Sequence, residues 1–277
     1  MTTWLITGCS TGLGRSLAEA VLDRGDNVIV TARDASRVAD VAKAYPDTAL
    51  ALSLDVTDHE QVAEAVRQAE ARFGAVDVLV NNAGYGYRAA VEEGDEADVE
   101  RLFATNFFGT VDMIKAVLPG MRARRHGVIV NVSSIGARVR PPGSGYYAAA
   151  KSAVEGMSGS LRAELRPLGI AVVVVEPGAF RTDFAGRSLT QSAAAIADYA
   201  ETAGRRRKEH DTTDGTQPGD PAKAAQAIIT AVTADAPPAL LLLGTDALRL
   251  VGDVLNAEQA ELAAWREVSA GTDFTGD

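Results

Sequence analysis

The chain has 277 residues, of which 47% are apolar and 23% charged, as is typical of globular proteins. Its net charge of −10 argues against nucleic acid or an anionic membrane as a partner. Cys9 is the only cysteine and the three histidines are scattered, so the sequence predicts neither a disulfide nor a metal site.

The amino-terminal stretch MTTWLITG lacks the basic and long apolar regions of a signal peptide. No apolar run approaches the roughly 20 residues that a membrane span requires. We therefore expect a cytoplasmic protein that does not bind membranes.

Seven short apolar runs, rich in β-branched residues, recur along the chain. They lie at residues 3–7, 27–32, 49–54, 76–81, 127–133, 170–176 and 239–243. Nearly continuous hydrophobicity of this kind indicates strands that are buried on both faces of a parallel sheet.

Helical segments are expected between these strands, at residues 12–24, 35–44, 58–73, 95–118, 147–167, 221–234 and 246–266. The alternation of strand and helix predicts an α/β fold, a Rossmann-type doubly wound parallel sheet of about seven strands flanked by helices. Because no Pro/Gly-rich linker interrupts it, we interpret residues 1–277 as a single domain. The long segment 179–217 interrupts the alternation of strand and helix, and loops of this length are usually functional or disordered.

The first strand runs into the sequence GCSTGLG, which opens the first helix. Gly8 permits a tight turn, and Gly12 and Gly14 let phosphates and the neighbouring strand approach the backbone. The start of the helix can donate N–H groups to a pyrophosphate. The motif predicts dinucleotide binding. The alternative is a plain strand-to-helix turn, and in either case Cys9 is a small residue without a redox role.

The TGxxxGxG spacing resembles the short-chain dehydrogenase/reductase family, in its compact branch. Six further motifs continue the resemblance in the family's order, and together they cover roughly residues 3–245. These motifs are LDVTD (54–58), NNAG (81–84), ATNFFGT around Asn106, NVSS (131–134), YAAAK (147–151) and EPGAFRT (176–182). Seven motifs in register are specific to this family.

The second strand ends in IVTARD, where NAD-binding folds usually place an acid for the ribose 2′-hydroxyl. Arg33 follows that position, and its guanidinium suits a 2′-phosphate, so we favour NADP(H) over NAD(H). Thr11 stands where NADP-preferring relatives often carry a second basic residue. The resemblance implies further cofactor contacts from Ser10, Thr11, Leu13, Asp55, Val56, Asn82, Ala83, Gly84, Pro177, Gly178 and Thr182, beside the three glycines.

Tyr147 and Lys151 are four residues apart, which places them on one face of a helix. A nearby ammonium favours tyrosinate, so we expect Lys151 to lower the pKa of Tyr147 toward neutrality. Tyr146 lacks this spacing and is expected either to touch substrate or to pack.

The resemblance implies the remaining roles in a carbonyl–alcohol reaction. Tyr147 is the acid/base, and Lys151 also binds the nicotinamide ribose. Ser134, rather than Ser133, binds the substrate oxygen, and Asn106 holds a water in the proton relay. Taken singly, each of these residues could be ordinary hydrogen-bonded structure.

Substrate contacts are expected from Tyr85, Phe180 and Phe184, with the segment 179–217 as a lid. Tyr87, Val139 and Leu189 could line the same apolar pocket. The alternative for Phe180 and Phe184 is that they pack the lid onto the sheet. The run RRRK at 205–208 could meet an anionic substrate, although a solvated loop is the simpler interpretation.

The sequence thus predicts an NADP(H)-dependent oxidoreductase that interconverts a carbonyl and a secondary alcohol of a small or lipophilic substrate. The alternatives are an NAD(H)-dependent alcohol dehydrogenase and a non-catalytic regulatory protein that senses dinucleotides. By resemblance, a homodimer or homotetramer is expected to form through the helices at 95–118 and 147–167.

Overall fold

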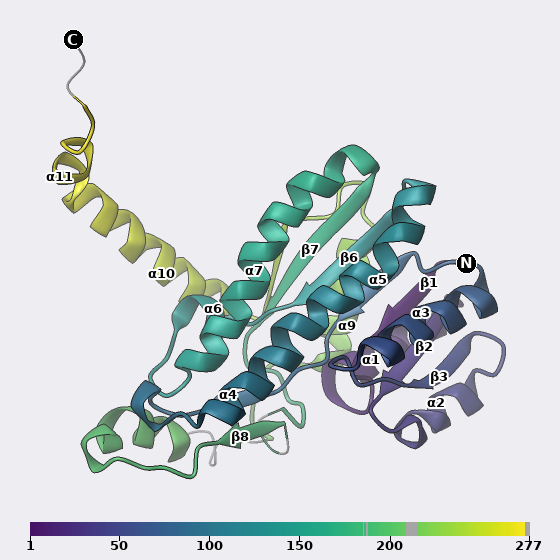
Figure 1. The fold of residues 1–277 in the computed structure, drawn as a ribbon, viewed down its shortest axis with the longest axis horizontal. Helices are drawn as coiled ribbons and strands as arrows, with labels where there is room; N and C mark the ends of the chain where they lie inside the picture. The colour runs from purple at the N-terminus through teal and green to yellow at the C-terminus, as the bar shows by residue number, and fades with distance from the viewer. Residues whose placement is uncertain (185, 187, 209–214, 275–277) are drawn as a thin grey trace.

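The computed structural model describes residues 1–184, 186, 188–208 and 215–274. Seven parallel strands form one sheet in the order β3-β2-β1-β4-β6-β7-β9, which confirms the expected doubly wound fold (Figure 1). The strands are β1 (Thr3–Ile6), β2 (Asn27–Ala32), β3 (Ala49–Ser53), β4 (Val78–Asn81), β6 (Gly127–Val132), β7 (Ile170–Pro177) and β9 (Leu240–Leu243). The strand order reverses between β1 and β4, and ligands of such sheets bind at this switch point.

Helices cover both faces of the sheet (Figure 1). They are α1 (Gly12–Asp23), α2 (Ala39–Ala44), α3 (His59–Phe73), α4 (Glu96–Phe103), α5 (Gly109–Arg124), α6 (Gly136–Val139), α7 (Gly145–Leu165), α9 (Pro221–Val232), α10 (Thr245–Ala264) and α11 (Arg266–Ala270). Within the described ranges, none of them combines the length and apolarity needed to cross a bilayer. The helix expected over 95–118 is divided, because a π-helical turn, Ala104–Phe108, joins α4 to α5.

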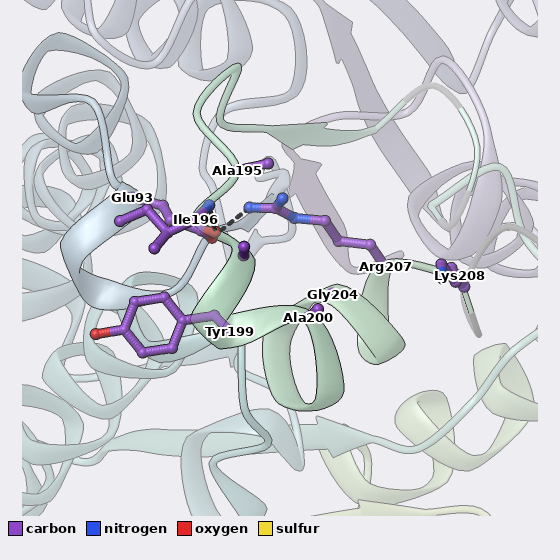
Figure 2. Close-up of a pocket in the computed structure, with 9 residues that line it drawn as sticks. Glu93, Ala195, Ile196, Tyr199, Ala200, Gly204, Arg207 and Lys208 are labelled. Carbon is purple, nitrogen blue, oxygen red and sulfur yellow. Dashed lines mark hydrogen bonds and ion pairs between the residues drawn. The ribbon is translucent and has the colours of Figure 1, made fainter.

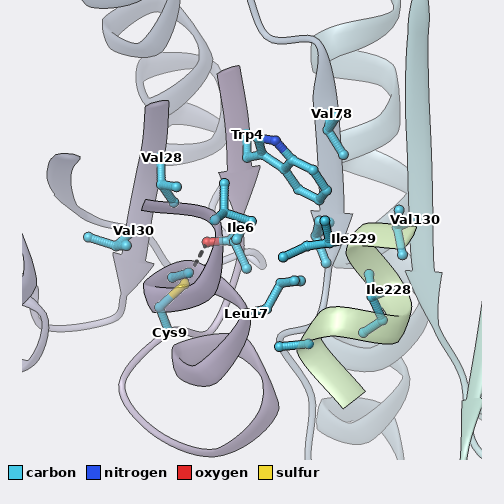
Figure 3. Packing of buried hydrophobic residues seen from close by; sticks show 14 of the residues in the cluster. Trp4, Ile6, Cys9, Leu17, Val28, Val30, Val78, Val130, Ile228 and Ile229 are labelled. Carbon is cyan, nitrogen blue, oxygen red and sulfur yellow. Dashed lines mark hydrogen bonds between the residues drawn. The ribbon is translucent and has the colours of Figure 1, made fainter. Parts of the chain in front are cut away.

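Two hydrophobic cores lie on opposite faces of the sheet because successive strand residues point to opposite sides. In β1, Trp4 and Ile6 belong to the core beneath α1 and α9, whereas Leu5 belongs to the core beneath α3, α5 and α7. Figure 3 shows the first of these cores, in which Cys9 Sγ donates to the Ile6 carbonyl at 3.2 Å. Burial raises the pKa of Cys9 to about 12, consistent with a purely structural role.

A second, two-stranded sheet was not expected from the sequence. β5 (Gly86–Arg88) pairs in parallel with β8 (Leu189–Gln191). Each strand has only three residues, too few for a periodic pattern to predict. The pairing brings the segment after β7 onto the segment after β4, at the end of the sheet where the cofactor-binding motif lies.

Candidate active site

The glycine turn between β1 and α1 is shaped to receive a phosphate group. Gly8 and Gly12 have φ of +74° and +63°, which other residues rarely adopt. Thr11 is the N-cap of α1 but makes no side-chain cap bond, and the first turn contains no acidic residue. The first N–H groups of α1 are therefore open to an anion, and the turn fits a dinucleotide.

Asn82 supports this turn from β4. Its Nδ2 donates to the carbonyls of Thr7 and Gly8 at 2.9 and 3.0 Å. A Cβ on Gly14 would lie 2.4 Å from that nitrogen, so only glycine fits there. Asn82 thus has a structural role in holding the turn. Beside it, Ala83 packs against Gly8, where an added Cβ would lie 2.9 Å from the Ala83 Cα.

Other predicted cofactor residues line the same end of the sheet. Arg33 is exposed directly after β2. The Asp55 carboxylate accepts from the Thr57 amide at 2.9 Å, which orders the loop after β3. Val56 is buried against α5, where a Cβ on Gly109 would lie 2.6 Å from it. Ser10 and Leu13 are half-buried in the glycine turn.

Across the glycine turn stands the loop that follows β7. A Cβ on Gly12 would lie 3.3 Å from the Thr182 side chain, so Thr182 faces the phosphate-binding turn. Half-buried Pro177 ends β7, and the Gly178 amide donates to the Leu243 carbonyl at 2.9 Å. These contacts bring both sides of the expected cofactor cleft together.

Asn106 and Lys151 meet at Gly84, the last residue of the NNAG motif. A Cβ on Gly84 would lie 3.1 Å from Asn106 Oδ1 and 3.5 Å from Lys151 Nζ. Asn106 lies in the π-helical turn, a distortion that is frequent at functional sites. Its side chain accepts from the Tyr85 amide at 3.1 Å and donates to the Tyr85 carbonyl at 2.8 Å.

Tyr147 and Ser134 form the other half of the predicted catalytic group. The Ser134 side chain lies close enough to Tyr147 to lower the pKa of its hydroxyl. Ser134 Oγ also accepts from the Gly136 amide at 3.0 Å, which orients it at the end of β6. Lys151 Nζ stands 5.9 Å from the centre of the Tyr147 ring. The structure thus brings all four predicted catalytic residues to one edge of the sheet.

The pKa of Tyr147 differs from expectation. Burial raises it to about 12, and the neighbouring Ser134 side chain offsets this only in part. The expectation that Lys151 lowers this pKa was wrong, because Lys151 is not among the groups that shift it. The reason is that Lys151 Nζ donates to the Val132 carbonyl at 2.8 Å, and that burial lowers the pKa of Lys151 itself to about 8.

The neighbouring residues left open by the sequence have structural contacts. The Tyr146 hydroxyl donates to the Val91 carbonyl at 2.7 Å, so Tyr146 packs. Ser133 is buried and donates to Glu155 Oε1 at 2.6 Å, away from the position of Ser134. Tyr87 is a core residue with 1% exposure rather than a pocket residue.

Among the predicted substrate residues, Phe184 lies nearest the chemistry. Its ring is centred 5.9 Å from that of Tyr147, and it is 39% exposed. Phe180 instead packs against the first core and Gly219, so its contacts support the packing alternative. Tyr85 is half-buried above the cluster of Tyr87 and Leu102.

The segment expected to form a lid is held in part by Glu93, which was not among the predicted site residues. Glu93, 4% exposed, accepts from the Ala90 and Ile196 amides at 2.9 and 2.8 Å. Arg207 forms an ion pair with the same carboxylate at 2.5 Å (Figure 2). Glu93 and Arg207 border a cavity of about 220 Å³, distinct from the catalytic group.

The solvated-loop interpretation of RRRK was therefore wrong for Arg207, whose side chain is only 15% exposed. The residues around Glu93, VEEGDE, form an ordinary acidic stretch and did not predict this ion pair. Residues 209–214 of the expected lid, and residues 185 and 187, lie outside the described part of the chain.

Comparison with known proteins places this architecture in a family. The short chain dehydrogenase family profile matches residues 2–193. The chain belongs to the short-chain dehydrogenase family. It is accordingly an oxidoreductase that acts on a CH–OH group with a nicotinamide dinucleotide.

Similar proteins cover between 72% and 99% of the chain. Oxidoreductase BOA17 of Botryotinia fuckeliana is 39% identical over 267 residues, 96% of this chain and 97% of its own. The 3-ketodihydrosphingosine reductase of Bacteroides thetaiotaomicron is 41% identical, over 72% of this chain and 71% of its own. A solved short-chain dehydrogenase from Streptomyces avermitilis is 44% identical, with a TM-score of 0.92 over 99% of this chain and 100% of its own.

Two further solved structures contain a cofactor. A short chain dehydrogenase from Burkholderia cenocepacia in complex with NADP is 27% identical, with a TM-score of 0.74 over 95% of this chain and 96% of its own. A 3-ketoacyl-(acyl-carrier-protein) reductase from Brucella melitensis, complexed with NADH, is 28% identical, with a TM-score of 0.74 over 87% of this chain and 95% of its own. Both cofactors therefore occur among proteins of this fold.

Proposed function

We propose that the protein is an NADP(H)-dependent oxidoreductase that interconverts a carbonyl and a secondary alcohol of a small or lipophilic substrate. The observation that carries this proposal is the convergence of Tyr147, Ser134, Lys151 and Asn106 beside the glycine turn. When bound, the nicotinamide dinucleotide supplies or accepts the hydride.

The chain's own residues handle the proton and the oxygen. Tyr147 gives its hydroxyl proton to the alkoxide that forms at the carbonyl oxygen, or takes it back in the oxidative direction. Ser134 donates a hydrogen bond to the same oxygen and stabilises its developing charge. Lys151 binds the cofactor ribose. Asn106 positions the water through which the proton is replaced.

Arg33 supports the choice of NADP(H). Its exposed guanidinium follows β2, where an acid would bind the free 2′-hydroxyl of NAD. We expect Arg33→Asp to weaken NADPH binding by about tenfold or more, the scale of one lost charge-assisted contact, and to leave NADH binding little changed. Fluorescence titration with each dinucleotide measures this. A wild type that binds NADH more tightly than NADPH would favour the alternative, an NAD(H)-dependent alcohol dehydrogenase.

Phe184 supports a lipophilic substrate, because its partly exposed ring borders Tyr147. The similarity to a 3-ketodihydrosphingosine reductase points in the same direction, since its named substrate is a ketone on a lipid. We also propose a cytoplasmic, single-domain protein that forms a homodimer or homotetramer.

Tyr147→Phe tests the mechanism, with Tyr146→Phe as the matched control. On any carbonyl substrate found by screening, we expect Tyr147→Phe to lower kcat by at least about 10²-fold, as loss of a general acid does. Its dinucleotide affinity should stay within a few-fold of wild type. Tyr146→Phe should keep nearly full turnover. Comparable turnover by wild type and Tyr147→Phe would contradict the mechanism, and a protein that binds dinucleotide without turnover would favour the regulatory alternative.

A further inference from the structure

A cluster of three charged residues, of which Glu176 is fully buried and Arg138 is 32% exposed, adjoins the proposed catalytic residues. Arg138 Nε on α6 is 3.1 Å from Glu176 Oε1 at the end of β7 and 3.4 Å from Glu155 Oε2 on α7. The side chain of Glu176 is fully buried, and that of Glu155 is 16% exposed. Buried carboxylates are rare unless they are paired, so the cluster calls for an explanation.

Each member of the cluster adjoins a residue of the proposed site. Glu155 follows Lys151 by one helical turn of α7. Ser133, whose hydroxyl donates to Glu155 Oε1 at 2.6 Å, immediately precedes Ser134. Glu176 immediately precedes Pro177 in the loop that faces the glycine turn. Arg138 and Ser133 therefore both hold the Glu155 carboxylate, and the four-residue spacing puts Glu155 and Lys151 on one face of α7.

The cluster contains two carboxyl groups and one guanidinium, so it is negatively charged when all three ionise. Burial raises the pKa of Glu176 to about 7, the nearby Glu155 carboxylate raises it as well, and Arg138 lowers it. Above neutral pH the cluster thus carries excess negative charge. Burial lowers the pKa of Lys151 to about 8, and the charge of Glu155 raises it against that effect.

We propose that Glu155 is a positioning residue that keeps the Lys151 ammonium protonated and thereby sets the upper pH limit for cofactor binding. Arg138, Glu176 and Ser133 hold its carboxylate in place. The inference rests on the proposed role of Lys151 as the ligand of the cofactor ribose. It adds a residue to the site that acts through Lys151 rather than on the substrate.

The other groups around Lys151 do not supply the negative charge that Glu155 supplies. Tyr147 faces it from the same helix and Asn106 from the π-helical turn, and Asn106 carries no charge. Val132 at the end of β6 offers a carbonyl at 2.8 Å. Beyond the cluster, Glu258 of α10 pairs with Arg140 at 3.4 Å and acts on Arg138. Among the described residues, Glu155 is the carboxylate whose charge raises the pKa of Lys151.

The test is the pH dependence of dinucleotide affinity. The Kd for NADPH and for NADH is measured by fluorescence from pH 6 to 10 on the full chain. The variants are Glu155→Gln, Ser133→Ala and, as the matched control, Glu164→Gln, which removes an exposed carboxylate farther along α7. We expect Glu155→Gln to move the alkaline loss of affinity down by at least about half a pH unit, a threefold change in the ratio of protonated to deprotonated Lys151. Ser133→Ala should move it less in the same direction, and Glu164→Gln should not move it.

If Glu155 had a purely structural role, Glu155→Gln would weaken dinucleotide binding equally at every pH. An unchanged midpoint in Glu155→Gln overturns the inference, even if affinity falls overall. Should Glu155→Gln fail to fold, Ser133→Ala decides, and an unchanged midpoint there overturns it as well. A wild type that binds neither dinucleotide overturns the proposed function together with this inference, whereas a wild type that binds while the variants show no shift overturns the inference alone.

Discussion

At the scale of single residues, burial determines the ionisation of the site more than sequence spacing does. Tyr147 and Lys151 have the four-residue spacing that predicts a mutual pKa effect. Both are nevertheless withdrawn from water, and this disfavours the charged form of each. Burial therefore raises the pKa of Tyr147 and lowers that of Lys151.

Lys151→Met should stabilise the protein while abolishing function. The pKa of Lys151 is about 8 in the folded protein against its usual 10.5, so the unfolded chain binds more protons between these values. The free energy of unfolding of the wild type should therefore rise between about pH 8 and pH 10.5. Below pH 8 the buried charge of Lys151 lowers the stability of the folded protein. We expect Lys151→Met to gain on the order of 1–2 kcal/mol at pH 7, measured by urea unfolding.

The exposed Lys223→Met is the control, and it should keep the wild-type slope of stability between pH 8 and 10. A Lys151→Met protein that is less stable than wild type at pH 7 would contradict this prediction. It would show that the hydrogen bond from Lys151 to the Val132 carbonyl stabilises the fold by more than burial of the ammonium destabilises it.

At the scale of elements, the turn between β1 and α1 depends on close backbone approach. A Cβ on Gly14 would meet Asn82 Nδ2 at 2.4 Å and the Gly8 carbonyl at 2.6 Å, and the latter cannot move without opening the turn. We expect Gly14→Ala to cost about 2–4 kcal/mol, the range of overpacked or strained core sites, and to weaken dinucleotide binding more than tenfold.

The control is Gly252→Ala in α10, where an added Cβ meets nothing within 4 Å. Because alanine is the better helix former, this variant should gain up to about 1 kcal/mol. Thermal unfolding and NADPH titration of both variants measure these effects. Normal dinucleotide binding by Gly14→Ala would contradict the assigned role of the turn.

Several contacts hold the expected lid segment, and the Glu93–Arg207 ion pair is one of them. Removing Arg207 leaves the Glu93 carboxylate buried without its cation, which is a costly state. We expect Arg207→Gln to raise amide hydrogen exchange over 189–208 at least about tenfold and to raise KM more than it lowers kcat.

Tyr199→Phe is the matched control in the same segment, because it removes only an exposed hydrogen bond to Glu92 at 2.7 Å. It should leave exchange and KM near the wild-type values. Equal exchange in Arg207→Gln and Tyr199→Phe would show that the ion pair does not hold the lid.

At the scale of the whole molecule, the carboxy-terminal arm stands apart from the body. Helix α10 leads away from the sheet, and α11 continues it (Figure 1). Every described residue from Leu255 onward is exposed, including Leu262 at 75% and Trp265 at 59%. Within one chain, this part of α10 buries little surface that could stabilise the fold.

Ending the chain after Asn256 should therefore change the monomer's melting temperature by no more than about 2 °C. In a protein of this size, such a shift corresponds to about 1 kcal/mol of stability or less. Calorimetry and light scattering on the truncated and full-length proteins measure this together with the mass of the assembly. A clear loss of stability, or a change of mass, would show that the arm packs against another copy of the chain.

The sequence determined the order of strands and helices, the glycine turn and the spacing from Ser134 through Tyr147 to Lys151. These features are local, because strand and helix periodicity and one-turn spacing are written in neighbouring residues. The tertiary structure alone decided that Glu93 meets Arg207 across 114 positions, that β5 pairs with β8, and that Phe180 packs while Phe184 faces Tyr147. It also decided the pKa values of Tyr147 and Lys151, because desolvation depends on which distant segments exclude water from a side chain.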